Sequence, residues 1–260
     1  MPSGSPDNSH VRVAAVGDLH FGKNSQGTFQ ALLTQISQAA EVLVLCGDFT
    51  DYGTPDEARG LVRELSAHLR IPALAVLGNH DYHSDAEAGV TERLRRIGVR
   101  VLEGTGTVIE AGGVRIGIAG TKGFGGGFAG ACGSDFGEPE MKAFIRHTQK
   151  LSDQLARTLE ELDADVRVAL LHYSPIPATL QGERLEIYPF LGSYLLAEAI
   201  DRSGADLVLH GHAHGGTERG VTPAGIRVRN VAQPVIRSAY RVYCFADGDL
   251  ACDEPPAAHA

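Results

Sequence analysis

The sequence predicts an α/β protein with a mostly parallel sheet core to which antiparallel strands are added. Short apolar runs rich in β-branched residues alternate with longer segments that carry apolar residues at helical spacing, which is the pattern of βαβ units. Other segments alternate across Gly-rich turns and indicate antiparallel hairpins. We therefore expect sheet-on-sheet packing with helices on the outside. The 260 residues, of which 43% are hydrophobic, suffice for one large domain.

The βαβ pattern sets the order of the elements. Strands are expected at Val11–Val16, Val42–Cys46, Ala73–Leu77, Val166–Leu171 and Asp206–Leu209. The intervening helices are expected at Thr28–Ala40, Pro55–Arg70, Ala86–Ile97, Pro139–Leu162 and Ser193–Arg202, with Pro55 in a favourable first-turn position.

The antiparallel part of the fold is expected in two places. The stretch "GTVIEAGGVRIGIAG" consists of two alternating runs joined at Gly112-Gly113, which favours a hairpin with a tight turn. The segments "GTERGVTPAGIRVRNV" and "RSAYRVYCFADGDL" close the chain with further strands and turns.

These elements indicate a single domain over residues 11–250, preceded by a disordered segment at 1–10 and followed by a flexible tail at 251–260. The N-terminal "MPSGSPDNSH" has neither the basic nor the apolar region of a secretory signal. The apolar runs are far shorter than the roughly 20 residues that cross a bilayer. We therefore expect a cytoplasmic protein with no membrane contact.

The net charge and the cysteine content indicate which partners and which thiol state to expect. The formal net charge of −9 makes a dedicated nucleic-acid binder less favoured, because such proteins rely on basic patches. The four cysteines lie far apart without CxxC spacing, which predicts reduced thiols rather than a disulfide framework; they are Cys46, Cys132, Cys244 and Cys252.

One biased segment invites a phosphate-loop interpretation. The stretch "KGFGGGFAG" at residues 122–130 is rich in glycine, but Lys122 comes before the glycines, whereas a phosphate loop has its lysine after them. We expect a mobile loop here, and its role stays open.

A polar cluster follows each expected strand. "VRVAAV" leads into "GDLH", "VLVLC" into "GDFTD", "LAVL" into "GNHD", "VALL" into "HYSP" and "DLVLH" into "GHAH". Right-handed crossovers place the carboxyl ends of parallel strands at one edge, where ligands bind. The sequence thus predicts that these side chains converge; they are Asp18, His20, Asp48, Asn79, His80, His172, His212 and His214.

The composition of this set indicates a metal site. Imidazole with carboxylate suits Mn, Fe, Zn, Co or Ni, whereas Mg or Ca prefers oxygen ligands alone. The lack of thiolate argues against structural zinc. The alternating pairs Asp18/His20 and His212/His214 are expected to project from one side of extended segments. The glycine before each of four clusters permits a sharp turn and a close approach.

The same motifs resemble the calcineurin-like metallophosphoesterase superfamily. Its DxH, GDxxD, GNHD/E, H and GHxH elements are matched by Asp18-Leu19-His20, Gly47–Asp51, Gly78–Asp81, His172 and Gly211–His214, so the resemblance spans about residues 11 to 245. It implies a four-layered α/β/β/α sandwich of mixed sheets. That architecture agrees with the parallel-plus-hairpin pattern.

The resemblance also implies roles for the residues. One metal would be held by Asp18, His20, Asp48 and His214, and the other by Asp48, Asn79, His172 and His212. His80 would stabilise the transition state and supply a proton, with Asp81 as its orienting partner. The ions are expected to be divalent, with Mn or Fe favoured. Two such ions and two aspartates leave a surplus of about +2 for a hydroxide and a phosphoryl anion.

Two differences from the protein Ser/Thr phosphatases indicate which branch of the superfamily this chain resembles. Protein Ser/Thr phosphatases of the superfamily carry GDxVDRG and GNHE, whereas this chain has "GDFTDYG", with Tyr52 in place of the Arg, and "GNHD". This favours the bacterial phosphodiesterase branch. The expected reaction is hydrolysis of a phosphodiester in a small phosphorylated or nucleotide-like molecule by a metal-bridging hydroxide. A phosphomonoesterase, a nuclease of the superfamily and a non-catalytic scaffold remain alternatives, and the oligomeric state stays open.

Overall fold

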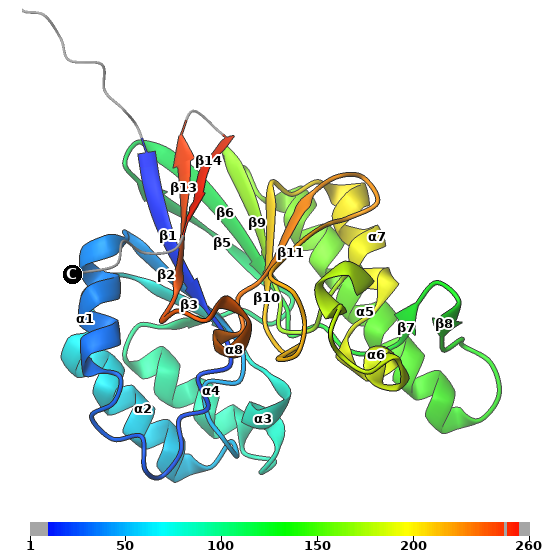
Figure 1. The fold of residues 1–260 in the computed structure, drawn as a ribbon, viewed down its shortest axis with the longest axis horizontal. Helices are drawn as coiled ribbons and strands as arrows, with labels where there is room; N and C mark the ends of the chain where they lie inside the picture. The colour runs from blue at the N-terminus through cyan, green and yellow to red at the C-terminus, as the bar shows by residue number, and fades with distance from the viewer. Residues whose placement is uncertain (1–9, 247–248, 255–260) are drawn as a thin grey trace, which may run out of the picture.

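Two six-stranded sheets pack face to face, with helices on both outer sides (Figure 1). The computed structural model describes residues 10–246 and 249–254. The four-layered α/β/β/α sandwich expected from the sequence is confirmed, and so are its mixed sheets. The ten strands and helices expected of the βαβ pattern all form, and their ends lie within two residues of the expected ones.

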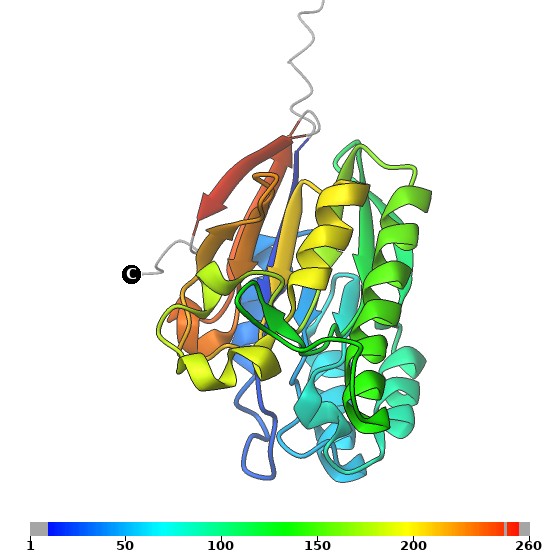
Figure 2. The ribbon, with the colours of Figure 1, turned by 90° about the vertical axis from the view of Figure 1, so that its right-hand side faces the viewer.

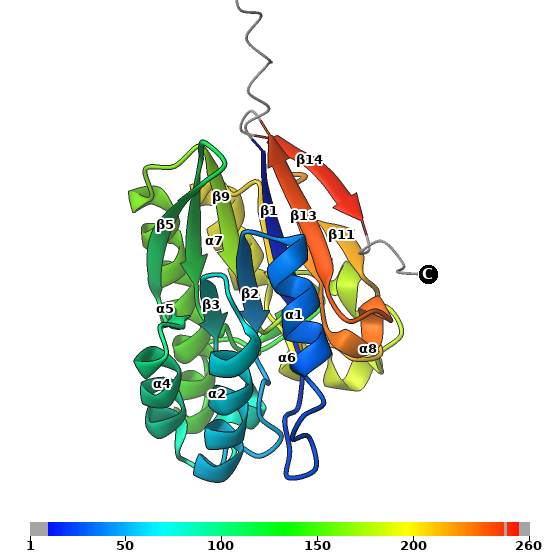
Figure 3. The ribbon, with the colours of Figure 1, turned by 90° about the vertical axis from the view of Figure 1, so that its left-hand side faces the viewer.

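The first sheet has the strand order β14-β13-β1-β2-β3-β4. Its parallel strands are β1 (His10–Val16), β2 (Val42–Cys46), β3 (Ala73–Val76) and β4 (Arg100–Val101), and β13 (Arg241–Ala246) and β14 (Asp249–Glu254) extend it antiparallel. Its outer face carries α1 (Gln30–Ala39), α2 (Pro55–His68) and α4 (Glu87–Arg96) (Figure 3). A capping box of Thr54 and Glu57 fixes the start of α2, with Pro55 in its first turn.

The second sheet has the strand order β11-β12-β10-β9-β6-β5. Its strands are β5 (Thr105–Ala111), β6 (Val114–Gly120), β9 (Val166–Leu170), β10 (Leu207–His210), β11 (Arg219–Val221) and β12 (Arg227–Asn230). The long α5 (Pro139–Glu161) and α7 (Tyr194–Ser203) cover its outer face (Figure 2). The expected hairpin is β5–β6, and both turn glycines, Gly112 and Gly113, have positive φ.

The main core lies between the two sheets. Leu43 and Leu45 of β2 belong to the same buried cluster as Val168 of β9 and Leu209 of β10, and each is at most 1% exposed. Because parallel strands buried on both faces must be apolar throughout, the continuous apolar runs of the sequence follow directly from this packing. The sandwich thus gives a rigid support for the loops at its edge.

Short elements connect the layers at that edge. They are α3 (Asn79–Tyr82), β7 (Gly127–Phe128), β8 (Ala131–Cys132), η1 (Pro177–Leu180), η2 (Leu185–Ile187), α6 (Tyr188–Leu191) and α8 (Gln233–Ile236). The Gly-rich loop, expected to be mobile, contains β7, which pairs with β8 in a small hairpin. Its backbone bonds to the 189–192 segment, from Gly126 N to Pro189 O at 2.7 Å and from Gly127 N to Gly192 O at 2.9 Å.

The ends of the domain differ slightly from the expected boundaries. His10 begins β1, and residues 251–254, expected in a flexible tail, pair with β13 as part of β14. The rest of the expected N-terminal segment and tail lies outside the described residues. Among the described helices, none combines the length and hydropathy that a membrane span requires.

The expectation of four reduced thiols is wrong for two of them. Cys244 and Cys252 occupy paired positions on β13 and β14, with Cα atoms 4.8 Å apart, and form a disulfide. Cys46 is buried in β2 and Cys132 is exposed, and both are free. Sequence spacing could not show this pair, because the strand register decides which residues face each other.

The disulfide predicts a defined alkylation result. Unfolding the protein without reductant and treating it with iodoacetamide should add two adducts, at Cys46 and Cys132, because disulfide sulfurs do not alkylate. The same treatment after reduction should add four. Intact-mass spectrometry makes the measurement, and four adducts without reductant would show that the Cys244–Cys252 bond is absent.

Candidate metal centre

The loops after five strands meet at one edge of the sandwich. They follow β1, β2 and β3 of the first sheet and β9 and β10 of the second. Adjacent loops bond to one another through the backbone, as from Asp18 N to Gly47 O (3.0 Å) and from Gly211 N to His172 O (3.2 Å). A bond from Gly17 N to Val231 O (2.9 Å) links the loop after β1 to the chain following β12. The convergence predicted from the sequence is therefore confirmed.

Four of the predicted ligands have a left-handed backbone. The φ angles are 60° for Asp18, 45° for His20, 50° for Asp48 and 71° for His212. The expectation that DxH and HxH are extended segments with alternating side chains is therefore wrong. Non-glycine residues in this region are strained and cluster at functional sites. The chain thus turns sharply after β1, β2 and β10, where these four residues lie.

Glycines at these turns leave room for the ligand side chains. A Cβ on Gly78 would overlap the Asp48 carboxylate, one on Gly211 would overlap that of Asp18, and one on Gly47 would overlap the His172 ring. From the sequence these glycines were expected to let the backbone approach the ions closely. The contacts show a different use, since each leaves room for a neighbouring ligand side chain.

The first group of predicted ligands centres on Asp18. This carboxylate is 3% exposed, and its Oδ1 accepts from His214 Nε2 at 2.8 Å and from the backbone N of His212 at 3.0 Å. His20 completes the group, because its ligand atom lies within 4.8 Å of those of Asp18 and His214.

The second group centres on Asp48, which is 1% exposed. Its Oδ1 accepts from the backbone N of His80 (2.8 Å), and its Oδ2 lies 3.4 Å from His172 Nε2. His172 Nε2 is also 2.9 Å from Asn79 Oδ1. Asp48, His172 and His212 bring their ligand atoms within 4.8 Å of one another. Asp48 forms a further such group with His20 and His80, so it lies between the two clusters.

Backbone carbonyls fix the ring nitrogen that each histidine presents. His172 Nδ1 donates to Cys46 O at 2.8 Å, which leaves Nε2 facing Asp48 and Asn79. His212 Nε2 donates to Phe190 O at 3.2 Å, which leaves Nδ1 as its available nitrogen. A carbonyl partner of this kind is the usual support of a metal-binding imidazole.

Burial and neighbouring charges shift the pKa values of the predicted histidine ligands. Burial lowers the pKa of His172, but the adjacent Asp48 carboxylate outweighs it and raises the pKa to about 9. Burial lowers the pKa of His212 to about 3, assisted by the positive charge of His172. Burial likewise lowers the pKa of His20. At pH 7 the His212 imidazole is thus neutral, the form that binds metal.

The group that orients His80 differs from the expectation. His80 Nδ1 donates to Asp51 O at 2.7 Å, so the backbone of Asp51 orients the ring, and Asp81 does not. The Asp81 carboxylate is fully buried and accepts from Thr50 N (3.0 Å), Thr50 Oγ1 (2.6 Å) and Gly78 N (2.9 Å). Asp81 therefore ties the loop after β2 to the loop after β3, because its side chain points into the backbone of both.

The surroundings of the Asp81 carboxyl raise its pKa. Burial raises the pKa of this carboxyl, the negative charge of Asp48 raises it further, and the three hydrogen bonds oppose them, which leaves it at about 7. Asp81 is a positioning residue for the ligand loops, and we assign it no direct contact with a substrate.

The residues present fit divalent metal ions. His20 Nε2 is buried and has no hydrogen-bond partner among the described residues, and an orphaned buried imidazole nitrogen needs a partner such as a metal ion. It lies among two buried carboxylates, of Asp18 and Asp48, and two further imidazoles, of His80 and His214, a donor set suited to transition metals. Asp18, His20, Asp48 and His214 would hold one ion, and Asp48, Asn79, His172 and His212 the other.

A family model supports the same conclusion from sequence. The model of the calcineurin-like phosphoesterases matches residues 11–216. The chain belongs to this family. Membership supports the activity of a phosphoric ester hydrolase and leaves the substrate undecided. No curated protein matches the chain in sequence.

Solved structures share the fold at low sequence identity. The phosphopantetheinyl hydrolase of Mycobacterium tuberculosis aligns with a TM-score of 0.64 at 16% identity, covering 88% of this chain and 92% of that chain. A putative 5′-nucleotidase of Staphylococcus aureus gives 0.59 at 16% identity, over 95% of this chain and 53% of that chain. GAP50, the anchor in the inner membrane complex of Plasmodium, gives 0.57 at 11% identity, over 95% and 88%. These likenesses establish the fold alone.

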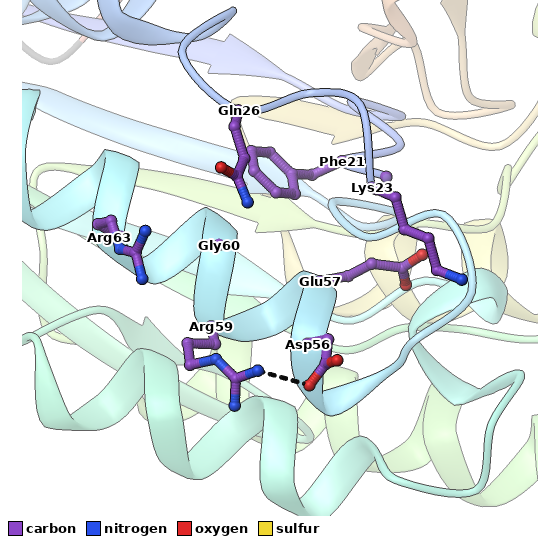
Figure 4. A pocket seen from close by; sticks show the side chains of 9 residues that line it. Phe21, Lys23, Gln26, Asp56, Glu57, Arg59, Gly60 and Arg63 are labelled. Carbon is purple, nitrogen blue, oxygen red and sulfur yellow. Dashed lines mark hydrogen bonds and ion pairs between the residues drawn. The ribbon is translucent and has the colours of Figure 1, made fainter.

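A separate depression lies beside α2 and contains none of the predicted ligands (Figure 4). Phe21, Lys23 and Gln26 line one side of it, and the first turns of α2 line the other. Its charges are partly satisfied within it, as Arg59 bonds Asp56 at 2.7 Å. We therefore place no reaction there.

Several supporting groups could not be found by motif. The carbonyls of Cys46 and Phe190 hold His172 and His212, and Thr50 holds Asp81 through both its backbone N and its hydroxyl. Backbone carbonyls carry no sequence signal. Asp51, by contrast, is the last residue of the GDxxD motif and could be found from the sequence. Its carboxylate lies 3.6 Å from His20 Nδ1.

The glycine contacts predict a loss of metal binding on Gly78→Ala. The added methyl group would displace the Asp48 carboxylate, which lies between both clusters, so the variant should bind fewer ions per chain than the wild type. Gly89→Ala on α4 is the matched control and should retain wild-type metal content, because its new methyl meets only the end of the flexible Arg93. Elemental analysis after loading with Mn²⁺ measures both. Full metal content in Gly78→Ala would contradict the assignment of Asp48.

Proposed function

We propose that this chain is a dinuclear-metal-dependent phosphoesterase that hydrolyses a phosphodiester in a small phosphorylated or nucleotide-like molecule. The observation that carries the proposal is the convergence of seven predicted ligand side chains from five loops, four of them on strained backbone, with His80 beside them. Strain of this kind persists only where the surrounding fold enforces it, and it clusters at functional sites. Family membership supports the same reaction class.

The chemistry of the donor set is suited to a phosphate ester. When bound, two divalent ions would supply positive charge to the phosphoryl oxygens and lower the pKa of water. Asn79 is a neutral ligand, so the protein offers only Asp18 and Asp48 as ligand carboxylates, and a positive surplus remains for the anionic substrate. Manganese or iron is the proposed metal.

His80 is the proposed proton donor. Its Nδ1–H is committed to Asp51 O, which leaves Nε2 as the nitrogen that can face a substrate. The ring packs edge to face on His20 with centroids 4.5 Å apart, so it lies beside the ligands without being required by them. A protonated His80 would donate to the leaving oxygen and thereby stabilise the developing alkoxide.

The preference for a diester rests on Tyr52. This residue stands where protein phosphatases of the superfamily carry an Arg, and its side chain is 53% exposed, near His83. A diester carries one negative charge and needs less cationic support than a dianionic monoester. A small substrate, a cytoplasmic location and the absence of a nucleic-acid partner belong to the same proposal, and the fold by itself does not determine them.

The test compares two esters and two histidine variants. The Mn²⁺-loaded protein is assayed with bis-p-nitrophenyl phosphate and with p-nitrophenyl phosphate. The wild type should hydrolyse the diester faster, and His80→Ala should lower kcat by about 10²–10⁴-fold, the usual contribution of a general acid. His83→Ala, which alters an exposed neighbour on the same turn, should retain wild-type kcat.

The outcomes separate the alternatives. Faster turnover of the monoester would replace the diesterase by a phosphomonoesterase. Unchanged turnover in His80→Ala would remove the proton-donor role. A metal-loaded wild type that hydrolyses neither ester would contradict the proposed phosphoesterase function.

A further inference from the structure

Lys122 lies beside the candidate metal centre without belonging to the ligand set. It follows β6 at the carboxyl edge of the second sheet. Its carbonyl accepts from the backbone N of His172 (3.1 Å) and of Tyr173 (3.0 Å), and its own N donates to Glu103 Oε2 (3.3 Å). These bonds fix the Lys122 backbone directly against a predicted ligand.

The side chain of Lys122 is enclosed by aromatic rings. The residue is only 8% exposed, and Nζ lies 4.7 Å from the ring centroids of Tyr82 and Phe124 and 5.4 Å from that of Tyr173. Such distances are those of cation–π contacts. Within residues 10–246 and 249–254, Nζ makes no hydrogen bond and no ion pair.

The enclosing rings come from segments that carry predicted ligands. Tyr82 ends α3, the helix of Asn79 and His80. Tyr173 follows His172, and its ring lies 4.3 Å from that of His212. The ammonium group is therefore on the Asn79 and His172 side of the centre.

Glu103, whose charge acts on this cation, forms no ion pair with it. Glu103 uses Oε1 to accept from Leu77 N at 2.9 Å and Oε2 to accept from Lys122 N. Burial lowers the pKa of the Lys122 ammonium, and the carboxylates of Glu103 and Asp48 oppose that shift. A buried charge is normally paired, because aromatic faces replace only part of its lost hydration. The Lys122 ammonium therefore keeps hydrogen-bond donors that an anionic oxygen could use.

We propose that Lys122 is a specificity-determining residue that receives an anionic oxygen of the phosphoryl group bound at the metal centre. The proposal rests on the phosphoesterase function proposed above. In a chain with Tyr52 at the position of the phosphatase Arg, Lys122 would add a single positive charge from a different loop, which suits the single negative charge of a diester. The first residue of the Gly-rich segment thus has a role that its motif did not reveal.

The test measures phosphate binding and turnover in matched variants. Wild type, Lys122→Met, Lys122→Arg and Lys150→Met are loaded with Mn²⁺, and the Kd of inorganic phosphate is measured by calorimetry. KM and kcat for bis-p-nitrophenyl phosphate, the ester that the proposed function favours, are measured in parallel. Lys150 is exposed on α5 and controls for the loss of one positive charge.

We expect Lys122→Met to weaken phosphate binding and to raise KM by about tenfold each, with a smaller change in kcat and with unchanged metal content. Lys122→Arg should recover part of the affinity, because it keeps the charge. Lys150→Met should remain within about twofold of the wild type. A Lys122→Met protein that binds phosphate as tightly as Lys150→Met would overturn the proposal, and so would the absence of phosphate binding by the metal-loaded wild type.

Two checks keep the result interpretable. Lys122→Gln is made in parallel, and the comparison uses whichever neutral variant keeps the thermal melting profile of the wild type. If the wild type binds phosphate but hydrolyses neither test ester, the proposed function fails, and the phosphate Kd of the Lys122 variants still decides the role of Lys122.

Discussion

The geometry of the site depends on the buried carboxylate of Asp48. Its Oδ1 holds the backbone N of His80, and its Oδ2 faces His172 from the opposite sheet. No side chain can be added at Gly78 without displacing it. A negative charge removed from water in this way is tolerable only among donors and cations, which explains why imidazoles and backbone N–H groups surround it.

The need to surround this buried carboxylate with donors also affects the backbone of the neighbouring loops. Asp18, His20, Asp48 and His212 all adopt left-handed conformations, which residues with a side chain avoid. The cost is offset by hydrogen bonds between adjacent loops and by the rigid core of the sandwich, whose strands are buried on both faces. Asp81 contributes by joining the loops after β2 and β3, because its carboxylate accepts from the backbone of both.

Charge is distributed unevenly over the protein. The chain has a formal charge of −9, yet the candidate centre combines few ligand carboxylates with many imidazoles, and Lys122 adds an enclosed cation at its side. Local positive charge within an acidic protein is suited to a small anion that enters a crevice, and it is poorly suited to an extended polyanion, which needs a broad basic surface. The aromatic rings around Lys122 preserve this local positive charge, because they keep the ammonium in place without neutralising it.

The sequence by itself determined the sandwich, the order of its strands and helices, and the eight polar residues that converge, because strand periodicity and strand-end motifs are local signals. It did not determine how those residues are held. The left-handed turns, the carbonyls that orient His80, His172 and His212, the Thr50 partner of Asp81 and the Cys244–Cys252 bond all depend on which chain segments become neighbours. Lys122 shows the same limit, since an isolated lysine before a run of glycines acquires meaning only when Tyr82, Phe124 and Tyr173 enclose it. Contacts between residues distant in the chain are products of packing, and local sequence patterns do not encode them.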